Sequence, residues 1–350
     1  MPLLRLLLHP LFLPHPLLLL PVRVPPLRQP APVRARPSRP ARDEAPRVST
    51  FLQQLVNGLS VGSIYALIAL GYTMVYGTLG LINFAHGEVF MIGCYIGLYA
   101  AFWLGYDALS AASFSPMSAT LVLLLAMAGA AIVGMLIERL AYRPLRGAPR
   151  LAPLITAIGV SLLLQNIAVL AFSANPRKFP SIITEHRLEF AGVTITNIKI
   201  FIFAVSILLM LALEFFVKKT WTGRAMRAIS FNLPAAKLMG VPADRVISLT
   251  FAIGSALAAA GGILFGLDQT KLEPLMGNMI GLKAFIAAVL GGIGNIRGAA
   301  IGGLLIGVAE LMTAGYISSD YRDAITFVIL IVILLFRPQG LLGVVRQEKV

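Results

Sequence analysis

Long apolar stretches separated by short polar intervals run through this chain from residue 55 to residue 336 and constrain its fold more than any other feature. Hydrophobic residues make up 58% of the chain and charged residues only 13%, and the mean hydropathy is +0.85. A soluble chain of 350 residues with this composition would expose too much apolar surface to water. Apolar stretches cross a bilayer as helices, because a helix satisfies its backbone hydrogen bonds internally. The sequence therefore predicts an all-α, polytopic integral membrane protein.

Nine apolar stretches are candidates for these helices, and several of them are short for a full span. They are residues 55–76, 89–104, 119–137, 154–172, 198–217, 246–267, 284–293, 298–312 and 324–336. We expect about eight to ten transmembrane helices, some of them broken, within a membrane domain of residues 48–345.

The first 47 residues differ in composition from everything that follows. They contain 12 of the 22 prolines and eight arginines, against one aspartate and one glutamate. Each proline inside a spanning helix removes a backbone hydrogen bond that lipid does not replace. Residues 1–20 have some features of a signal peptide, but prolines break the apolar region and no small-residue cleavage site follows. We expect a disordered extension or a mis-assigned start.

The basic residues indicate how the chain is oriented in the membrane. The formal net charge is +14, and Arg and Lys concentrate in the extension and in the intervals 139–150, 218–245 and 337–349. Basic short loops lie in the cytoplasm, so the polar intervals 173–197 and 318–323 fall outside. This distribution argues against nucleic-acid binding. Counting backward places Phe51 outside. That placement conflicts with the arginine-rich extension, unless the extension is not made or residues 78–88 re-enter the membrane.

The basic interval 218–245 has the pattern of two short helices. Met226, Ile229 and Leu233 recur at helical spacing and form an apolar stripe, while Arg224 and Arg227 fall on another face. From this pattern alone, two interpretations stay open. The interval is a compact cytoplasmic elbow that docks into a groove of a partner, or it is a solvated loop that joins two spans.

Three residues mark the boundaries of the second short helix in this elbow. Pro234 suits the first helical turn, Gly240 suits the position just after the helix end, and Pro242 prevents continuation.

Two glycine-rich segments interrupt the apolar pattern in a similar way, one in each half of the chain. Residues 77–88 (GTLGLINFAHGE) and 291–303 (GGIGNIRGAAIGG) each place an asparagine three or four residues before a glycine. Paired breaks of this kind are what two structural repeats leave in a sequence, and such breaks line permeation paths. The glycines at 254, 261, 262, 302, 303 and 307 are better explained by close helix packing.

The inventory of chemical groups argues against an enzyme. His86 and Glu88 are two residues apart and point apart on a helix, and no second histidine lies within ligand reach. Cys94 is the only cysteine, which excludes an intrachain disulfide and a cysteine metal cluster. We therefore expect no catalytic site, metal or cofactor. His86 and Glu88 suit an interfacial polar pair at the start of a helix near Val89.

Three further polar side chains fall within apolar stretches. Glu310 is either a contact in the pathway or between subunits, or a side chain that reaches to the outer surface. Gln165 and Asn166 are expected to form hydrogen bonds between helices rather than to bind solute.

Three parts of the sequence together resemble the permease subunits of branched-chain amino-acid ABC importers. They are GSIYALIALGYTMVYGTLGLINFAHGEVFMIG, the elbow with GRAMRAI and AAKLMGV, and KAFIAAVLGGIGNIRGAAIGGLLIGVAE. The similarity extends from about Phe51 to Arg346. Of the two permease types in such importers, the chain is similar to the one that carries NFAHGE near its first spans.

The resemblance implies a heteromeric importer in the bacterial plasma (inner) membrane. Its expected partners are a second, related permease, two ATPase subunits, an external solute-binding protein and the lipid bilayer. No nucleotide-binding motif G-x-x-x-x-G-K-[ST] occurs in the sequence, so ATP hydrolysis is expected on the partner subunits. The implied substrates are leucine, isoleucine and valine. Urea or short amides are an alternative within the family, and a stand-alone channel or ion-driven carrier is an alternative of another class.

The resemblance also assigns candidate site residues. ABC importers carry a coupling motif E-A-A-x-x-x-G, which Ala235, Ala236 and Gly240 match here, with Pro234 in place of the glutamate. The residues expected to couple the chain to the ATPase are Arg224, Arg227, Ala235, Ala236 and Gly240. Those expected along the translocation path are Asn83, His86, Gly87, Glu88, Gly294, Asn295 and Glu310.

Overall fold

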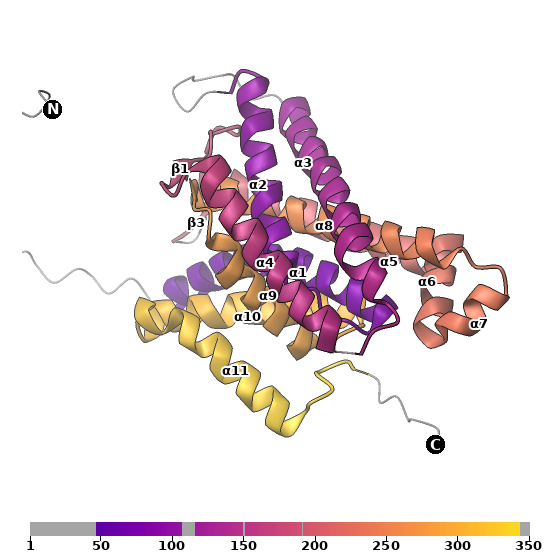
Figure 1. Ribbon diagram of the computed structural model, residues 1–350. Coiled ribbons are helices and arrows are strands. Elements are labelled where there is room, and N and C mark those ends of the chain that lie inside the picture. The colour runs from indigo at the N-terminus through magenta and orange to yellow at the C-terminus, as the bar shows by residue number, and fades with distance from the viewer. Residues whose placement is uncertain (1–46, 107–115, 150, 191, 344–350) are drawn as a thin grey trace, which may run out of the picture. The chain divides into compact units, whose positions relative to one another are not determined.

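The computed structural model describes residues 47–106, 116–149, 151–190 and 192–343 (Figure 1). The predicted extension, apart from its last residue, and the basic residues Arg346 and Lys349 lie outside the described residues. The described part is predominantly helical. Its long helices are α1 (Arg47–Leu79), α2 (His86–Trp103), α3 (Pro116–Ile137), α4 (Leu151–Phe172), α5 (Asn197–Lys219), α8 (Ala243–Gln269), α9 (Met276–Gly291), α10 (Ile296–Tyr316) and α11 (Arg322–Phe336).

Shorter elements connect these helices. They are the π-helical turn η1 (Glu138–Tyr142), the 3-10 turns η2 (Arg143–Leu145) and η3 (Ser319–Tyr321), the helices α6 (Trp221–Phe231) and α7 (Leu233–Leu238), and the strands β1 (Arg177–Lys178), β2 (Arg187–Phe190), β3 (Val193–Thr196) and β4 (Lys271–Leu272). Strand β1 pairs antiparallel with β4, and β2 pairs antiparallel with β3. The all-α prediction thus omits two small strand pairs.

All nine predicted apolar stretches lie largely within helices, and six of these helices are long and apolar enough to cross a membrane. The six are α1, α3, α4, α5, α8 and α10. Helix α2 carries a histidine and a glutamate in its first turn, while α9 and α11 have only 16 and 15 residues. Six spans are therefore supported by length and composition, and the count of eight to ten stays a prediction.

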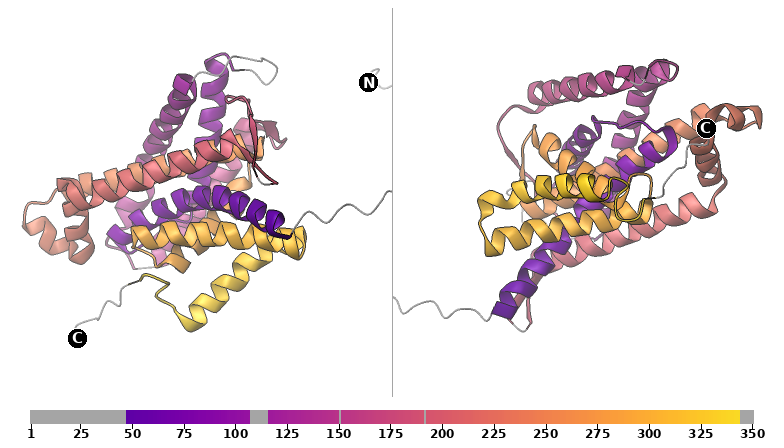
Figure 2. Two further views of the ribbon diagram at one scale, coloured as in Figure 1. Left: turned by 180° about the vertical axis from the view of Figure 1, so that it is seen from behind. Right: turned by 90° about the horizontal axis from the view of Figure 1, so that it is seen from below.

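Helices α1 and α8 form the centre of the described domain, and small residues let their neighbours approach closely. Helix α10 lies antiparallel along α1 (Figure 2). A Cβ atom added to Gly307 would lie 2.3 Å from the Cα of Gly62, and one added to Gly303 would lie 2.5 Å from the Cα of Ala66. Only glycine fits at such backbone distances. The packing role predicted for these glycines is therefore confirmed.

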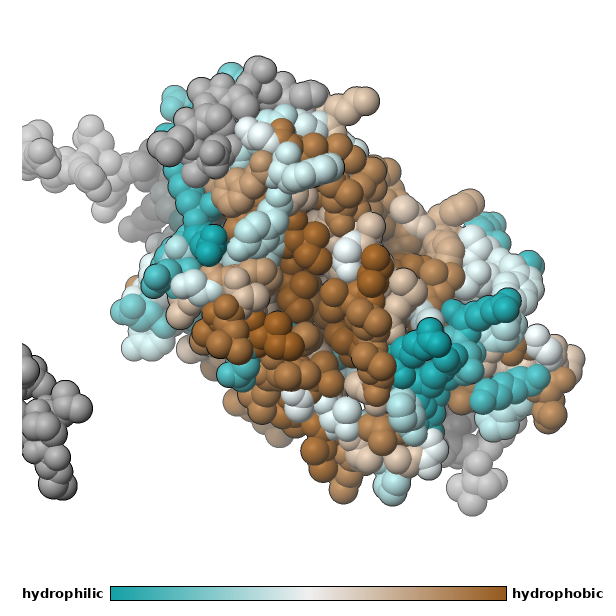
Figure 3. All heavy atoms as spheres, turned by 45° about the horizontal axis from the view of Figure 1, so that its top comes forward, coloured by the Kyte–Doolittle hydropathy of each residue, from teal (hydrophilic) through white to brown (hydrophobic). Residues whose placement is uncertain are grey.

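The peripheral helices α3, α4, α5 and α11 expose many of their apolar side chains. Leu163, Leu170 and Leu208, for example, are more than half exposed. In Figure 3 such side chains cover the middle of the visible face, and hydrophilic side chains gather toward its two ends. An apolar belt between polar ends is the surface that a bilayer covers.

Two helices, α2 and α9, begin in contact with each other. The chain turns back after α1, and α2 begins with His86, whose imidazole lies where a Cβ atom on Gly71 would be placed. Likewise, α9 begins beside the start of α2. A Cβ atom on Gly87 would lie 2.3 Å from the carbonyl oxygen of Gly277. The N-termini of α2 and α9 are therefore in contact. The first turn of α2 is buried, whereas Leu275 and Asn278 at the start of α9 are exposed.

The described parts of the three basic intervals lie at one end of the helices, hereafter the basic end. Arg143 pairs with Asp244 at the start of α8 (2.9 Å), and Arg297 at the start of α10 pairs with Glu214 near the end of α5 (2.6 Å). The backbone of residues 341–342 donates hydrogen bonds to the end of α9.

Helix α1 begins at the opposite end, where the polar interval 173–197 lies. Gln53 Nε2 in its second turn donates to the carbonyl oxygen of Thr194 (3.0 Å). This placement agrees with counting backward from the basic intervals, which puts Phe51 on the other side from the elbow.

Candidate functional site

The elbow between α5 and α8 consists of the two short helices that its sequence predicts, α6 and α7, which project from the basic end (Figure 1). Thr220 caps α6 by accepting a hydrogen bond from the backbone N–H of Gly223 (3.1 Å). Gly223 permits a tight turn, because a Cβ atom there would lie 2.1 Å from the carbonyl oxygen of Val217. Asn232 caps α7 in the same way by accepting from the N–H of Ala235 (3.0 Å).

The boundaries predicted for α7 are confirmed. Pro234 lies in its first turn, where a missing N–H costs no hydrogen bond. Gly240 follows the C-cap with φ +79° and donates to the carbonyl oxygen of Lys237 (3.0 Å), while Val241 donates to that of Ala236 (3.0 Å). These two bonds make a complete Schellman motif. Pro234 therefore removes the negative charge that the glutamate of the importer motif would supply, but it leaves the helix intact.

The predicted stripe of the elbow is its packed face. Met226 and Ile229 are buried, and Leu233 is half-buried. Arg224 lies on the exposed face as predicted. Arg227 is also exposed, but its guanidinium donates to the carbonyl oxygen of Val217 at the end of α5. Arg227 thus holds α6 against α5.

The two alanines of the importer motif face different ways. Ala236 is buried, whereas Ala235 is exposed.

Sequence reasoning missed three apolar side chains at the tip of the elbow. Phe231, Leu238 and Met239 are 91%, 89% and 83% exposed. Their exposure could have been predicted, because none of the three belongs to the apolar stripe of Met226, Ile229 and Leu233.

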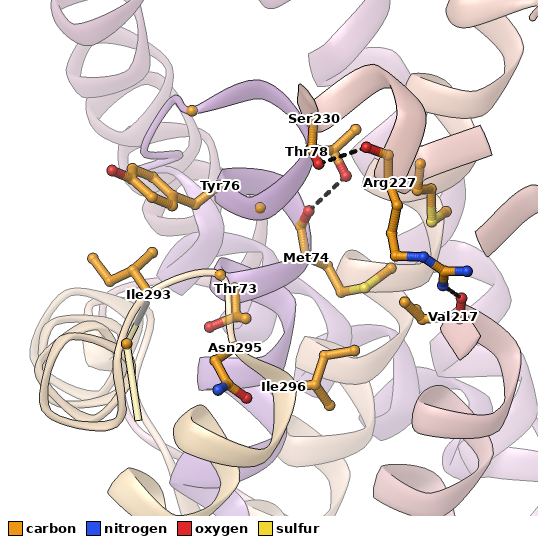
Figure 4. Close-up of a pocket in the computed structure, with 15 residues that line it drawn as sticks. Thr73, Met74, Tyr76, Thr78, Val217, Arg227, Ser230, Ile293, Asn295 and Ile296 are labelled. Carbon is orange, nitrogen blue, oxygen red and sulfur yellow. Dashed lines mark hydrogen bonds between the residues drawn. The ribbon is translucent and has the colours of Figure 1, made fainter. Parts of the chain in front are cut away.

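A cavity of about 500 Å³, hereafter the inner cavity, lies between the elbow and the two glycine-rich breaks (Figure 4). Its lining includes Thr78 from the end of α1, Met226 and Arg227 from α6, and Gly294 and Asn295 from the turn between α9 and α10. The structure thus brings together one predicted coupling residue and two predicted path residues.

Asn295 and Gly294 also have local roles in this turn. Asn295 caps α10 by accepting from the N–H of Gly298 (3.2 Å), and its amide donates to the carbonyl oxygen of Leu342 (2.7 Å). Gly294 has φ +94°, a conformation that favours glycine. The two residues therefore fix the turn that borders the inner cavity.

The other predicted path residues near the first break are buried. Asn83 accepts a hydrogen bond from the hydroxyl of Tyr142 (3.0 Å), which ties the break to η1. The His86 ring lies edge-on to Tyr72, with centroids 4.7 Å apart. Gly87 packs against the start of α9, as described above. Helix α2 begins at His86 rather than near Val89, and Glu88 lies in its first turn as predicted. Asn83, His86 and Glu88 are all buried, so they lie inside the protein instead of at an interface.

Glu88 borders a second, smaller cavity of about 210 Å³, hereafter the Glu88 cavity. The Glu88 side chain is buried, and its Oε1 accepts from Gln165 Nε2 of α4 (2.8 Å). The interhelical hydrogen bond predicted for Gln165 is therefore confirmed. The same prediction for Asn166 is wrong. Its amide donates to the carbonyl oxygen of Leu162 within α4 (2.7 Å).

Glu310 lies in a buried ionic cluster and does not reach to the outer surface. Its carboxylate pairs with Lys283 of α9 (2.9 Å) and Arg322 of α11 (3.3 Å). It also accepts hydrogen bonds from Tyr65 (3.0 Å) and Thr326 (2.8 Å). Glu310 lines neither cavity, so the structure does not bring it together with the other predicted path residues.

The described helices, the apolar belt and the broken segments define a multi-pass membrane protein with cavities between its helices. The family model for the permease component of branched-chain amino acid transport systems matches residues 54–334. The chain therefore belongs to this permease family.

Relatives in three organisms are similar along almost their whole length. The high-affinity branched-chain amino acid transport system permease protein BraD of Pseudomonas aeruginosa is 47% identical over 313 residues, which cover 87% of this chain and 100% of BraD. LivH of Escherichia coli, a permease protein of the same description, is 46% identical over 86% of this chain and 98% of LivH. A probable branched-chain amino acid transport permease protein of Methanocaldococcus jannaschii is 29% identical over 83% of this chain and 92% of its own length.

Proposed function

We propose that the chain is the transmembrane subunit that moves leucine, isoleucine and valine inward across the bacterial plasma membrane. The observation that carries this proposal is the 47% and 46% identity to two high-affinity branched-chain amino acid permeases over 100% and 98% of their lengths. A permease for autoinducer 2 is 30% identical over only 41% of this chain, which gives weaker support to another solute.

The proposed importer contains two ATPase subunits, a second related permease and an external solute-binding protein. The ATPase docks on the elbow, which is cytoplasmic. Phe231, Leu238 and Met239 support this role, because large apolar side chains exposed on a polar loop mark an interaction surface. Arg224 and Ala235 share the exposed side of the elbow, whereas Arg227, Ala236 and Gly240 fix its shape.

Movement of the elbow on ATP hydrolysis is transmitted to the inner cavity by residues of α6 that line it. Arg227 lines the inner cavity directly, together with Gly294 and Asn295. A rigid-body shift of α6 therefore changes the width of this cavity. We assign Gly294 and Asn295 to the cytoplasmic mouth of the translocation path. Asn83, His86, Gly87 and Glu88 lie deeper along it, and Glu310 stabilises its wall.

The two proposed repeats are α1 to α4 and α8 to α11. Six residues, 80–85, separate α1 from α2, and six residues, 270–275, separate α8 from α9. Adding 190 to Ile64 and Gly71 gives Gly254 and Gly261, and these four residues form two reciprocal close contacts. A Cβ on Gly254 would lie 3.2 Å from the carbonyl oxygen of Gly71, and one on Gly261 would lie 3.5 Å from that of Ile64. The segment that corresponds to the first break is then 270–275 rather than 291–303.

Reconstitution tests the proposed function. The chain is purified with the second permease and the ATPase, placed in liposomes, and supplied with the binding protein outside and ATP inside. We expect uptake of labelled L-leucine that stops when ATP is omitted and that valine and isoleucine inhibit. Uptake that is independent of ATP, or inhibited by urea but not by valine, would refute the proposal.

A further inference from the structure

The Glu88 cavity lies where the N-termini of α2 and α9 meet, and residues of four helices line it. Glu88 belongs to the first turn of α2, Tyr72 comes from α1, Ser161 and Gln165 come from α4, and Asn278 lies in the first turn of α9. Its apolar lining is Phe84, Ile158, Leu162, Leu282 and Phe285. The cavity therefore combines a few polar groups with an apolar wall, as small-molecule sites do.

The two carboxylate oxygens of Glu88 have different surroundings. Oε1 accepts from Gln165 (2.8 Å) and from Ser161 Oγ (3.4 Å), so α4 holds the carboxylate in place. Oε2 is buried and has no hydrogen-bond partner among the described residues. It lies beside the start of α9, since a Cβ on Gly277 would be 2.7 Å from it. A buried, unpaired carboxylate oxygen is costly unless a ligand satisfies it.

The charges around the cavity define the class of ligand. Among the described residues that line it, Glu88 is the only charged side chain. It can pair with one cationic group. The positive ends of α2 and α9 attract an anionic group at the same point. A ligand with one ammonium and one carboxylate matches this arrangement, and its remaining atoms contact the apolar wall.

Size sets a further limit. Pockets for drug-sized ligands occupy roughly 300–1,000 Å³. The Glu88 cavity, at about 210 Å³, suits a smaller molecule.

We infer that the Glu88 cavity is a transport subsite for a zwitterionic aliphatic amino acid. The α-ammonium donates to Oε2 of Glu88, the α-carboxylate lies against the N-terminus of α9 near Asn278, and the aliphatic side chain packs on Leu162 and Phe285. This inference rests on the proposed function, because it names where the translocated amino acid pauses between the outer side and the inner cavity.

Ligand binding to the assembled transporter, without its binding protein, tests the subsite. The complex in lipid nanodiscs is titrated with labelled L-leucine and with two competitors, isopentylamine, which lacks the carboxylate, and isocaproate, which lacks the ammonium. We expect saturable binding for which isopentylamine competes better than isocaproate. Glu88→Gln keeps the contact with Gln165 but removes the charge. It should weaken leucine binding by about tenfold or more, because a hydrogen bond to a charged group is lost.

A pair of size variants keeps the test independent of the glutamate. Leu162 and Leu163 are neighbours on the exposed side of α4, 53% and 57% exposed, but only Leu162 lines the cavity. Leu162→Phe should reduce leucine binding, and Leu163→Phe should not.

Three results would overturn the subsite. They are no saturable binding by a complex that imports leucine, unchanged affinity in Glu88→Gln, or equal effects of the two phenylalanine variants. If the wild-type complex itself does not import leucine in liposomes, the proposed function fails instead. The two failures are therefore separate observations.

Discussion

Replacing Lys283 by methionine tests whether the ionic cluster around Glu310 stabilises the fold. Lys283 is about 6% exposed, and it bridges Glu310 (2.9 Å) and Asp323 (2.6 Å), which joins α9 to α10 and α11. The Glu310 carboxylate is fully buried. Without Lys283 it keeps Arg322 at 3.3 Å as its remaining cationic partner.

Removing one partner of a buried ion pair costs about 3–5 kcal/mol, because the other charge stays buried without compensation. Arg322, Tyr65 and Thr326 still contact Glu310, so we expect a loss near the lower limit, about 3 kcal/mol. The double variant Lys283→Met with Glu310→Met should recover much of this loss, since well-packed apolar residues replace buried pairs at little cost.

The free energy of unfolding is measured in mixed micelles of lipid and SDS, with tryptophan fluorescence as the signal. Lys218→Met is the matched control. Lys218 pairs with Glu214 (2.5 Å) but is 52% exposed, so its loss should not be measurable. The reasoning is refuted if Lys283→Met is no less stable than Lys218→Met, or if the double variant is less stable than the single one.

Three further variants test other parts of the structure. Gly307→Ala should separate α1 from α10 and cost about 1–3 kcal/mol of unfolding free energy. Gly159→Ala is the control, because its Cβ would meet no atom of the described residues within 4 Å, and equal stabilities of the two variants would contradict the packing. Gly240→Ala forces alanine into a left-handed conformation at a cost of about 1–2 kcal/mol and should reduce leucine-coupled ATPase activity. Gly147→Ala serves as the control, and equal ATPase rates in the two variants would contradict the role of the cap. Phe231→Ser should leave the melting temperature unchanged but weaken co-purification of the ATPase, and unchanged recovery of the ATPase would argue against docking at this residue.

Local features of the fold were predictable from the sequence because they depend on neighbouring residues. The apolar stretches predicted the helices, and the basic intervals predicted which loops share one end. The two helices of the elbow and the end of α7 at Gly240 also followed, since caps and Schellman motifs form within a few residues. The motif around NFAHGE identified the family, which the model match over residues 54–334 confirms.

Burial and pairing between distant segments were not predictable in the same way. The sequence placed His86 and Glu88 at an interface, because polar groups beside an apolar stretch often mark its end, but the start of α9 covers them. It left open whether Glu310 reaches the surface, because the partners of its carboxylate come from other helices, Tyr65 from α1, Lys283 from α9 and Arg322 from α11.

By itself, then, the sequence determined the membrane class, the helical segments, the elbow and the family of this protein, all of which depend on local patterns and short motifs. Only the tertiary structure decided that the N-termini of α2 and α9 are in contact and that the first turn of α2 is buried. It also decided which oxygen of Glu88 has no hydrogen-bond partner in the described part of the chain and which side chains of the elbow stay exposed. The physical reason is that close packing of helices and the satisfaction of buried polar groups depend on residues about 190 positions apart, such as Gly87 and Gly277, which no local pattern relates.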